Sequence, residues 1–148
     1  MISERAAMIG WREWVTLPRL CESQIKAKVD TGAKTSSLHA HDLLLISVGE
    51  RTVAQFQLHP DADTDRGSTM VVAPVVDFRT IRSSNGEAQR RPVIRTEMLL
   101  GEHRLEIDLT LTCRAAMGHR MLLGRRMLED RFVVDPGRSF LITERTLV

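Results

Sequence analysis

The sequence predicts an all-β domain that carries one short helix. Apolar and polar residues alternate with the strand period of two over residues 25–29, 54–58 and 105–113. A strand with this pattern buries one face and exposes the other to water, which favours antiparallel sheets. Residues 124–130 are the stretch that favours a helix. Many short strands with a single helix are typical of a barrel-like or sandwich-like β domain.

Further strands are predicted where β-favouring residues cluster. Residues 43–48 and 70–78 are two such runs, and residues 139–143 form a last one after the turn Asp135-Pro136-Gly137. Pro74 lies inside the second run and cannot donate a ladder hydrogen bond, so we expect a sheet edge or a bulge there.

A turn dipeptide in the middle of the chain predicts a long hairpin. Asn85-Gly86 is flanked on both sides by β-like segments. This dipeptide accommodates the positive backbone angles that tight hairpin turns require. We therefore expect residues 77–97 to form one hairpin.

Size and charge define the broad class of the protein. A chain of 148 residues predicts one domain, and a formal net charge of +2 with 4% aromatic residues argues against a nucleic-acid surface. No apolar run approaches the roughly 18 residues needed to span a bilayer, and the polar start of the chain does not look like a secretion signal. We therefore expect a cytoplasmic location, where Cys21 and Cys113 would be reduced and buried as small core residues.

The segment most suggestive of chemistry is Val29-Asp30-Thr31-Gly32-Ala33, directly after a predicted strand. Asp30 places a carboxylate at the strand end, Thr31 can stabilise the loop by hydrogen bonding, and Gly32 permits close approach of a substrate. An Asp-Thr-Gly turn without any chemistry has the same three residues. The order of the surrounding elements favours the catalytic interpretation.

That order resembles the retropepsin-like aspartic proteases. They have an Asp-Thr-Gly-Ala loop after an early strand, a flap hairpin, and an apolar segment ending in Gly-Arg before a C-terminal helix. The chain is most similar to a bacterial family labelled "ATP-dependent zinc protease", found near ATP-grasp ligases of the ribosomal-protein glutamate-ligase type. The matching segments are residues 25–40, 91–94 and 121–125. The resemblance implies a single-lobed acid-protease barrel over residues 10–148, after an N-terminal arm of residues 1–9.

The resemblance also implies a catalytic mechanism. Two closely spaced carboxylates share one proton around a water molecule, so that one acts as base and the other as acid. The chain offers one such residue, Asp30, because Asp135-Pro136-Gly137 lacks the hydroxyl residue. We therefore expect a homodimer in which two Asp30 side chains meet across a two-fold axis, with Thr31 and Gly32 completing each loop. No cofactor is implied.

Substrate contacts are expected in the loop, the flap and the helix start. Retropepsins usually place an acidic residue after Asp-Thr-Gly-Ala, and here that position is Lys34, which would face Arg125. An acidic peptide, such as a glutamate-rich tail, would relieve the repulsion between these two cations. The expected substrate-binding residues are Ala33, Lys34, Arg82, Ser84, Asn85, Gly86, Arg90, Arg91 and Arg125.

Three other functions stay open at this level. The domain could be a non-catalytic binding module or regulator that partners an ATP-grasp ligase. It could be a metallopeptidase, because His39 and His41 would point to the same face of a strand, although they also suit polar positions flanking a strand. A basic barrel that binds nucleic acid is disfavoured by the near-neutral charge.

Overall fold

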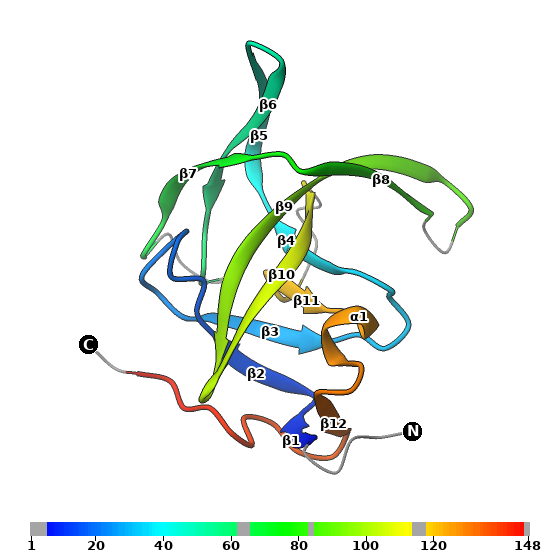
Figure 1. Ribbon diagram of the computed structural model, residues 1–148. Helices are drawn as coiled ribbons and strands as arrows, with labels where there is room; N and C mark the ends of the chain where they lie inside the picture. Colours follow the sequence, from blue (N-terminus) through cyan, green and yellow to red (C-terminus); the bar gives the residue numbers. More distant parts are fainter. Residues whose placement is uncertain (1–5, 62–65, 83–84, 114–117, 147–148) are drawn as a thin grey trace.

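Twelve strands and one short helix build the protein in the computed structural model, which describes residues 6–61, 66–82, 85–113 and 118–146 (Figure 1). The strands form sheets of seven, three and two strands. This confirms the predicted all-β class with a short helix. The sheets do not close into a barrel, because the edge strands of the seven-stranded sheet do not pair with each other.

The seven-stranded sheet contains strands from all three segments that resemble protease motifs, residues 25–40, 91–94 and 121–125. In spatial order the strands are β2 (Arg12–Val15), β3 (Ile25–Val29), β11 (Met121–Leu123), β4 (Ser36–His39), β10 (His103–Thr112), β9 (Ala88–Leu100) and β8 (Asp77–Arg82). β11 runs parallel to β3 and antiparallel to β4, so the C-terminal motif is inserted between two N-terminal strands.

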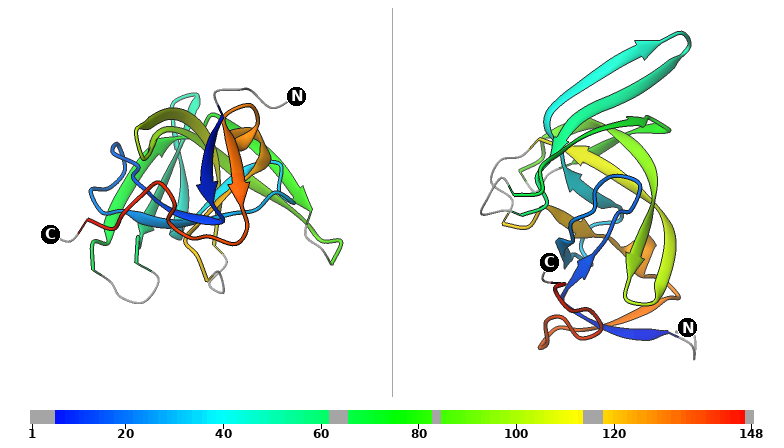
Figure 2. Two further views of the ribbon diagram at one scale, coloured as in Figure 1. Left: turned by 90° about the horizontal axis from the view of Figure 1, so that it is seen from below. Right: turned by 90° about the vertical axis from the view of Figure 1, so that its left-hand side faces the viewer.

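Two smaller sheets flank this one. β5 (His41–Val48), β6 (Arg51–Leu58) and β7 (Thr69–Pro74) form an antiparallel sheet, and the β5–β6 hairpin extends away from the body (Figure 2). β1 (Ala7–Gly10) pairs in parallel with β12 (Phe132–Asp135), close to the helix α1 (Arg125–Leu128). Residues 7–9, which we assigned to an arm, thus belong to a strand.

The alternating pattern places the core as expected. Ile25, Ala27 and Phe56 are buried, as are Leu109 and Leu111 from the longest alternating run. Lys26, Lys28, Gln55 and Gln57 between these residues are half-buried or exposed, as a period of two predicts, whereas Thr110 and Thr112 of the longest run are buried as well. The sheets are therefore held together by one shared apolar cluster.

Several local predictions can be compared directly with the structure. Residues 77–97 do form a hairpin, made of β8 and β9, and Pro74 ends the edge strand β7. Residues 139–143 were expected to form a strand and do not; backbone amides of this segment bind the Glu13 carboxylate instead of a sheet ladder. Cys21 is buried as predicted, whereas Cys113 is exposed because it lies just beyond the end of β10.

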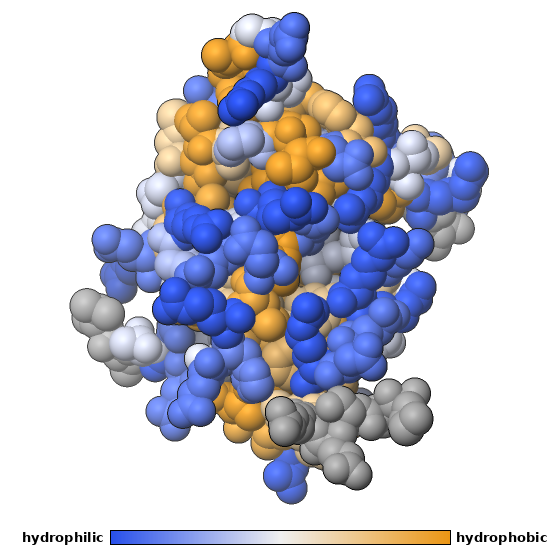
Figure 3. Space-filling model, viewed as in Figure 1, coloured by the Kyte–Doolittle hydropathy of each residue, from blue (hydrophilic) through white to orange (hydrophobic). Residues whose placement is uncertain are grey.

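Part of the apolar surface stays uncovered. The outer face of the three-stranded sheet exposes Leu44, Ile46 and Val48 of β5 together with Met70 and Val72 of β7. Figure 3 shows this apolar region above a band of hydrophilic residues. Within the described residues, every helix is too short or too polar to cross a membrane.

Candidate active site

The Asp30 loop begins where β3 ends. The Asp30 amide donates to the carbonyl oxygen of Leu123 at 2.9 Å, which ties the loop to β11. The amides of Gly32 and Ala33 turn back to donate to the Asp30 Oδ1 and carbonyl oxygens, at 3.0 and 3.1 Å. The carboxylate is therefore oriented by the backbone of its own turn, at a half-buried position that solvent reaches.

Gly124 allows the two motifs to pack closely. Its amide donates to Ser36 Oγ at 3.0 Å, and a Cβ atom at this position would lie 2.5 Å from the backbone carbon and oxygen of Thr35. No side chain other than hydrogen fits this crossing without moving the backbone. The following amides of Arg125 and Arg126 donate to the carbonyl oxygens of Ala33 and Lys34, at 2.8 and 3.1 Å. The start of α1 thus rests directly on the Asp30 loop.

A cleft of about 780 Å³ lies in front of this loop. One wall is the loop itself, with Asp30, Gly32, Ala33 and Lys34. The opposite wall is β8 of the hairpin, with Arg79 to Arg82. The hairpin that the sequence predicts as a flap therefore borders the same cavity as the Asp30 carboxylate.

The other predicted substrate residues lie in different places. Arg82 and Arg91 line the cleft, whereas the Arg90 guanidinium lies over the Phe78 ring at 4.3 Å and lines a separate pocket with Val75 and Val76. Asn85 and Gly86 form the hairpin tip, where Gly86 has a φ of 87° and its carbonyl oxygen accepts from Arg82 Nη1 at 3.2 Å. Ser84 lies outside the described residues.

Lys34 and Arg125 do not share a cavity, in contrast to our expectation. Arg125 Nη1 donates to the Thr31 carbonyl oxygen at 3.0 Å. Arg125 and Thr31 line a largely apolar pocket of about 410 Å³ beside α1, which Lys34 does not line. Arg126 lines the cleft with Lys34. Adjacent helical residues point about 100° apart, so a one-residue difference decides which arginine faces the cleft. The sequence offered Arg125-Arg126 as neighbours but no signal that separates them.

Positive charge dominates the lining of the cleft. Asp30 is its acidic lining residue, against the cations Lys34, Arg79, Arg82, Arg91 and Arg126. Arg79 belongs to the arginine-rich hairpin of the sequence but was not among the predicted substrate-binding residues, and neither was Arg126. Arg79 Nη2 donates to Asp108 Oδ2 at 3.0 Å, so part of its charge is already balanced.

Asp108 is the acidic centre of the adjoining network. It accepts from Arg95 Nε at 2.8 Å as well as from Arg79. The hydrogen bond from Arg95, followed by that from Arg79, holds the pKa of the Asp108 carboxyl below its ordinary value, against the opposing effect of partial burial. The hydrogen bond to Asp108 and the negative charge of Asp108 raise the pKa of Arg95. Asp108 is therefore a carboxylate at neutral pH, and both arginines are cations.

The histidines are arranged differently from a typical metal site. His39 is buried in β4, and its ring centroid lies 6.5 Å from that of His41, which in turn stacks edge-on against His59 at 5.1 Å. Across the part of the chain that the structure describes, no group of three or more His, Cys, Asp or Glu side chains is placed to hold a metal ion. A zinc site at His39 and His41 gains no support from this geometry.

A protein family and a solved structure both match this chain over most of its length. A family model described as "Retropepsin-like aspartic endopeptidase RimB" matches residues 8–145. A crystal structure of a protein of unknown function from Legionella pneumophila superposes with a TM-score of 0.75 at 28% sequence identity, covering 92% of this chain and 98% of that one.

Curated relatives carry a different name. A "Probable alpha-L-glutamate ligase" of Shewanella pealeana is 40% identical over 144 residues, which is 97% of this chain and 31% of that protein. One from Parasynechococcus marenigrum is 43% identical over 138 residues, or 91% of this chain and 29% of that protein. The chain thus spans about a third of the length of these relatives.

Proposed function

The chain belongs to the RimB-like family of retropepsin-like aspartic endopeptidases, and on this basis we propose that it hydrolyses peptide bonds as a homodimer. Each subunit supplies one Asp30. Two carboxylates at close range cannot both ionise, so the pair holds one proton between them. The ionised carboxylate accepts a proton from water while the resulting hydroxide attacks the carbonyl carbon. The protonated carboxyl supplies the proton that the departing amine needs.

The position of Asp30 is the observation that carries this proposal. Its carboxylate is oriented by the Gly32 amide and borders the cleft, and the neighbouring Thr31 and Gly32 are exposed. A loop of this kind is one half of a carboxylate pair and leaves room for a second copy beside it. The apolar pocket next to Thr31, lined by Leu128, Phe132 and others, offers surface that a partner subunit could cover.

The β8–β9 hairpin acts as the flap in this proposal. Thr80, Ile81 and Arg82 face the cleft from the side opposite to Asp30. Movement of the hairpin toward the loop would cover the substrate and exclude water from the carboxylate pair. The excess of cations around the cleft favours a peptide with acidic side chains, because guanidinium groups pair well with carboxylates.

A non-catalytic role is the second candidate function. The region similar to this chain makes up about 30% of relatives named probable alpha-L-glutamate ligase. A protease-fold module could bind an ATP-grasp ligase or its acidic product and regulate it without any hydrolysis. The same ligase names make a glutamate-rich tail the first substrate to test for the catalytic candidate.

One experiment separates the two candidates. Wild-type protein and the Asp30→Asn variant are incubated with a glutamate-extended peptide and a neutral peptide, and products are identified by mass spectrometry. We expect cleavage by the wild type alone, with a pH profile set by two apparent pKa values. Binding of the glutamate-extended peptide without turnover by either protein would support the module. Activity that persists in Asp30→Asn would refute the carboxylate pair.

The oligomeric state needs its own measurement. Light scattering coupled to size-exclusion chromatography reports whether active samples contain dimers. A variant such as Val134→Arg, at a half-buried position that lines the pocket beside Thr31, should weaken both dimer formation and turnover. Full turnover by a species that stays monomeric throughout the assay would contradict the proposed mechanism.

A further inference from the structure

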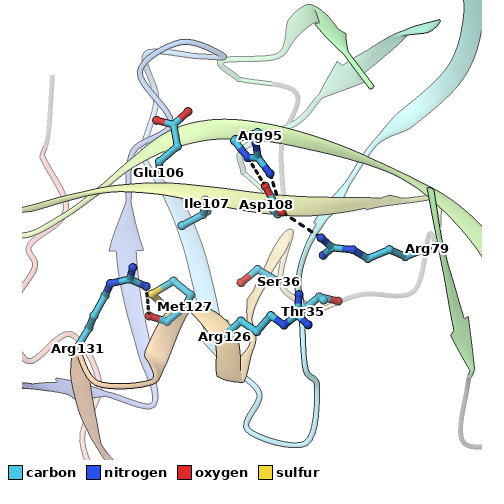
Figure 4. Close-up of a pocket in the computed structure, with 10 residues that line it drawn as sticks. All are labelled: Thr35, Ser36, Arg79, Arg95, Glu106, Ile107, Asp108, Arg126, Met127 and Arg131. Carbon is cyan, nitrogen blue, oxygen red and sulfur yellow. Dashed lines mark hydrogen bonds and ion pairs between the residues drawn. The ribbon is translucent and has the colours of Figure 1, made fainter. Parts of the chain in front are cut away.

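A second cavity, of about 310 Å³, adjoins the cleft between α1 and the strands β8 to β10. It shares Thr35, Arg79 and Arg126 with the cleft. Figure 4 shows arginines on several sides of this cavity, with the apolar side chains Ile107 and Met127 between them. We name it the arginine pocket after the residues that define it: Arg79, Arg95, Arg126 and Arg131, with Ile107 and Met127 between them.

The acidic groups of the arginine pocket do not balance its cations. One carboxylate, Asp108, is shared by Arg79 and Arg95. The other, Glu106, pairs with Arg19 outside the pocket at 3.2 Å. Four arginines therefore face two acids that already have partners, which leaves an excess of positive charge at the pocket mouth.

Arg126 and Arg131 carry most of that excess. Arg131 Nη1 donates to the Met127 carbonyl oxygen at 3.3 Å, a contact that orients the guanidinium without neutralising it. Neither Arg126 nor Arg131 forms an ion pair with any residue the structure describes. The two guanidinium groups come from the helix and the turn after it, so they approach the pocket from the side opposite to Asp108 (Figure 4).

We propose that the arginine pocket binds one glutamate side chain of the peptide that lies in the cleft. Guanidinium groups match the two oxygens of a carboxylate, and an anion here would balance the uncompensated charge. Ile107 and Met127 offer an apolar surface for the methylene groups of a glutamate stem. This assignment rests on the proposed function only in that it takes the cleft as the place where a peptide binds.

Arg131 makes the proposal testable, because it lines the arginine pocket but not the cleft. Neutral peptides in which a single glutamate is moved from position to position are compared with matched glutamine peptides. Binding is measured by fluorescence anisotropy with the Asp30→Asn protein, so that hydrolysis does not interfere. We expect a glutamate preference at one position, and Arg131→Gln should reduce that preference roughly tenfold, the effect of losing one charge-assisted hydrogen bond.

Two further variants make the test specific. Arg104→Gln is the matched control, because Arg104 is a highly exposed arginine that pairs with Glu97 away from both cavities, and it should leave the preference unchanged. Arg131→Glu should reverse the preference, so that lysine at the same peptide position binds better than glutamine. The reversal distinguishes a direct charge contact from a general loss of structure.

Specific outcomes would overturn the assignment. If Arg131→Gln weakens the binding of glutamate and glutamine peptides equally, the pocket does not recognise the glutamate side chain. The same conclusion would follow if Arg104→Gln and Arg131→Gln changed the glutamate preference equally. Displacement of the peptide by inorganic phosphate at the same concentration would assign the pocket to a free anion instead. If the glutamate preference depends on Arg131 but the wild type cleaves no peptide, the pocket stands and the catalytic proposal fails.

Discussion

Replacing the buried carboxylate of Glu13 should destabilise the protein strongly, because five hydrogen bonds converge on it. Glu13 lies in β2 with no exposed surface. Its Oε2 accepts from the amides of Gly10 and Leu141 at 2.6 and 2.8 Å. Its Oε1 accepts from the amides of Ile142 and Thr143 and from Thr143 Oγ1. One side chain therefore holds the C-terminal segment against the second strand.

The size of the effect follows from these contacts. In Glu13→Gln one carboxylate oxygen becomes an NH₂ group, and whichever oxygen changes, at least two buried or part-buried amide donors then face another donor. Each unsatisfied buried donor costs about 1–3 kcal/mol, so the free energy of unfolding should fall by about 2–6 kcal/mol. For a chain of this length that corresponds to a lower melting temperature, on the order of 10 °C.

Urea denaturation followed by circular dichroism measures this loss. Glu102→Gln is the control, because Glu102 is exposed in the turn between β9 and β10 and should change stability by less than about 0.5 kcal/mol. Glu13 also pairs with Ala27 of the strand that leads into Asp30, so this substitution should loosen the support of the candidate site as well. A loss below about 1 kcal/mol for Glu13→Gln, with an unchanged urea dependence, would refute the argument.

Three more predictions follow from other contacts. Gly124→Ala should lower the free energy of unfolding by about 1–3 kcal/mol, because the new Cβ atom would lie 2.5 Å from the Thr35 backbone. Urea denaturation measures the loss. Gly118→Ala is the control and should be nearly neutral, since Gly118 has open space around it. Arg95 is the main cause of the lowered pKa of Asp108, so the wild type should be more stable than Asp108→Asn above about pH 4. This difference in unfolding free energy should disappear as the pH falls through the lowered pKa. A difference that does not depend on pH would contradict this. A thiol reagent should modify the folded protein rapidly at Cys113 alone, since Cys21 is buried and burial raises the pKa of its thiol; a fast phase that survives Cys113→Ser would refute this.

Local patterns predicted the elements whose cause is local. The alternation in residues 105–113 predicted a strand, and the structure has β10 over His103–Thr112, although its last four residues are buried on both faces. The turn residues Asn85-Gly86 likewise predicted the hairpin of β8 and β9. Residues 139–143 have the same β-favouring composition and form no strand, because their amide partner is a carboxylate from Glu13 rather than another strand.

The candidate site likewise combines residues that the sequence indicated with residues that only the tertiary structure brings together. Asp30 at the end of a strand and Gly124 before a helix were identified as candidates because their motifs and the order of those motifs resemble a known protease family. Which arginine faces the cleft was not, since Arg125 and Arg126 are equivalent in the sequence and differ only in their direction on α1. Arg79, Asp108 and Arg131 come from three separate elements and had no common signal.

Residue order by itself determined the β class, the hairpin and the Asp-Thr-Gly loop of this protein, because each depends on side chains within a few positions of one another. Tertiary structure alone decided that β11 passes between β3 and β4, that Glu13 binds the C-terminal segment, and that four arginines surround one pocket. These arrangements join residues far apart in the chain. Their stability depends on burial and charge balance in three dimensions, which no local pattern records.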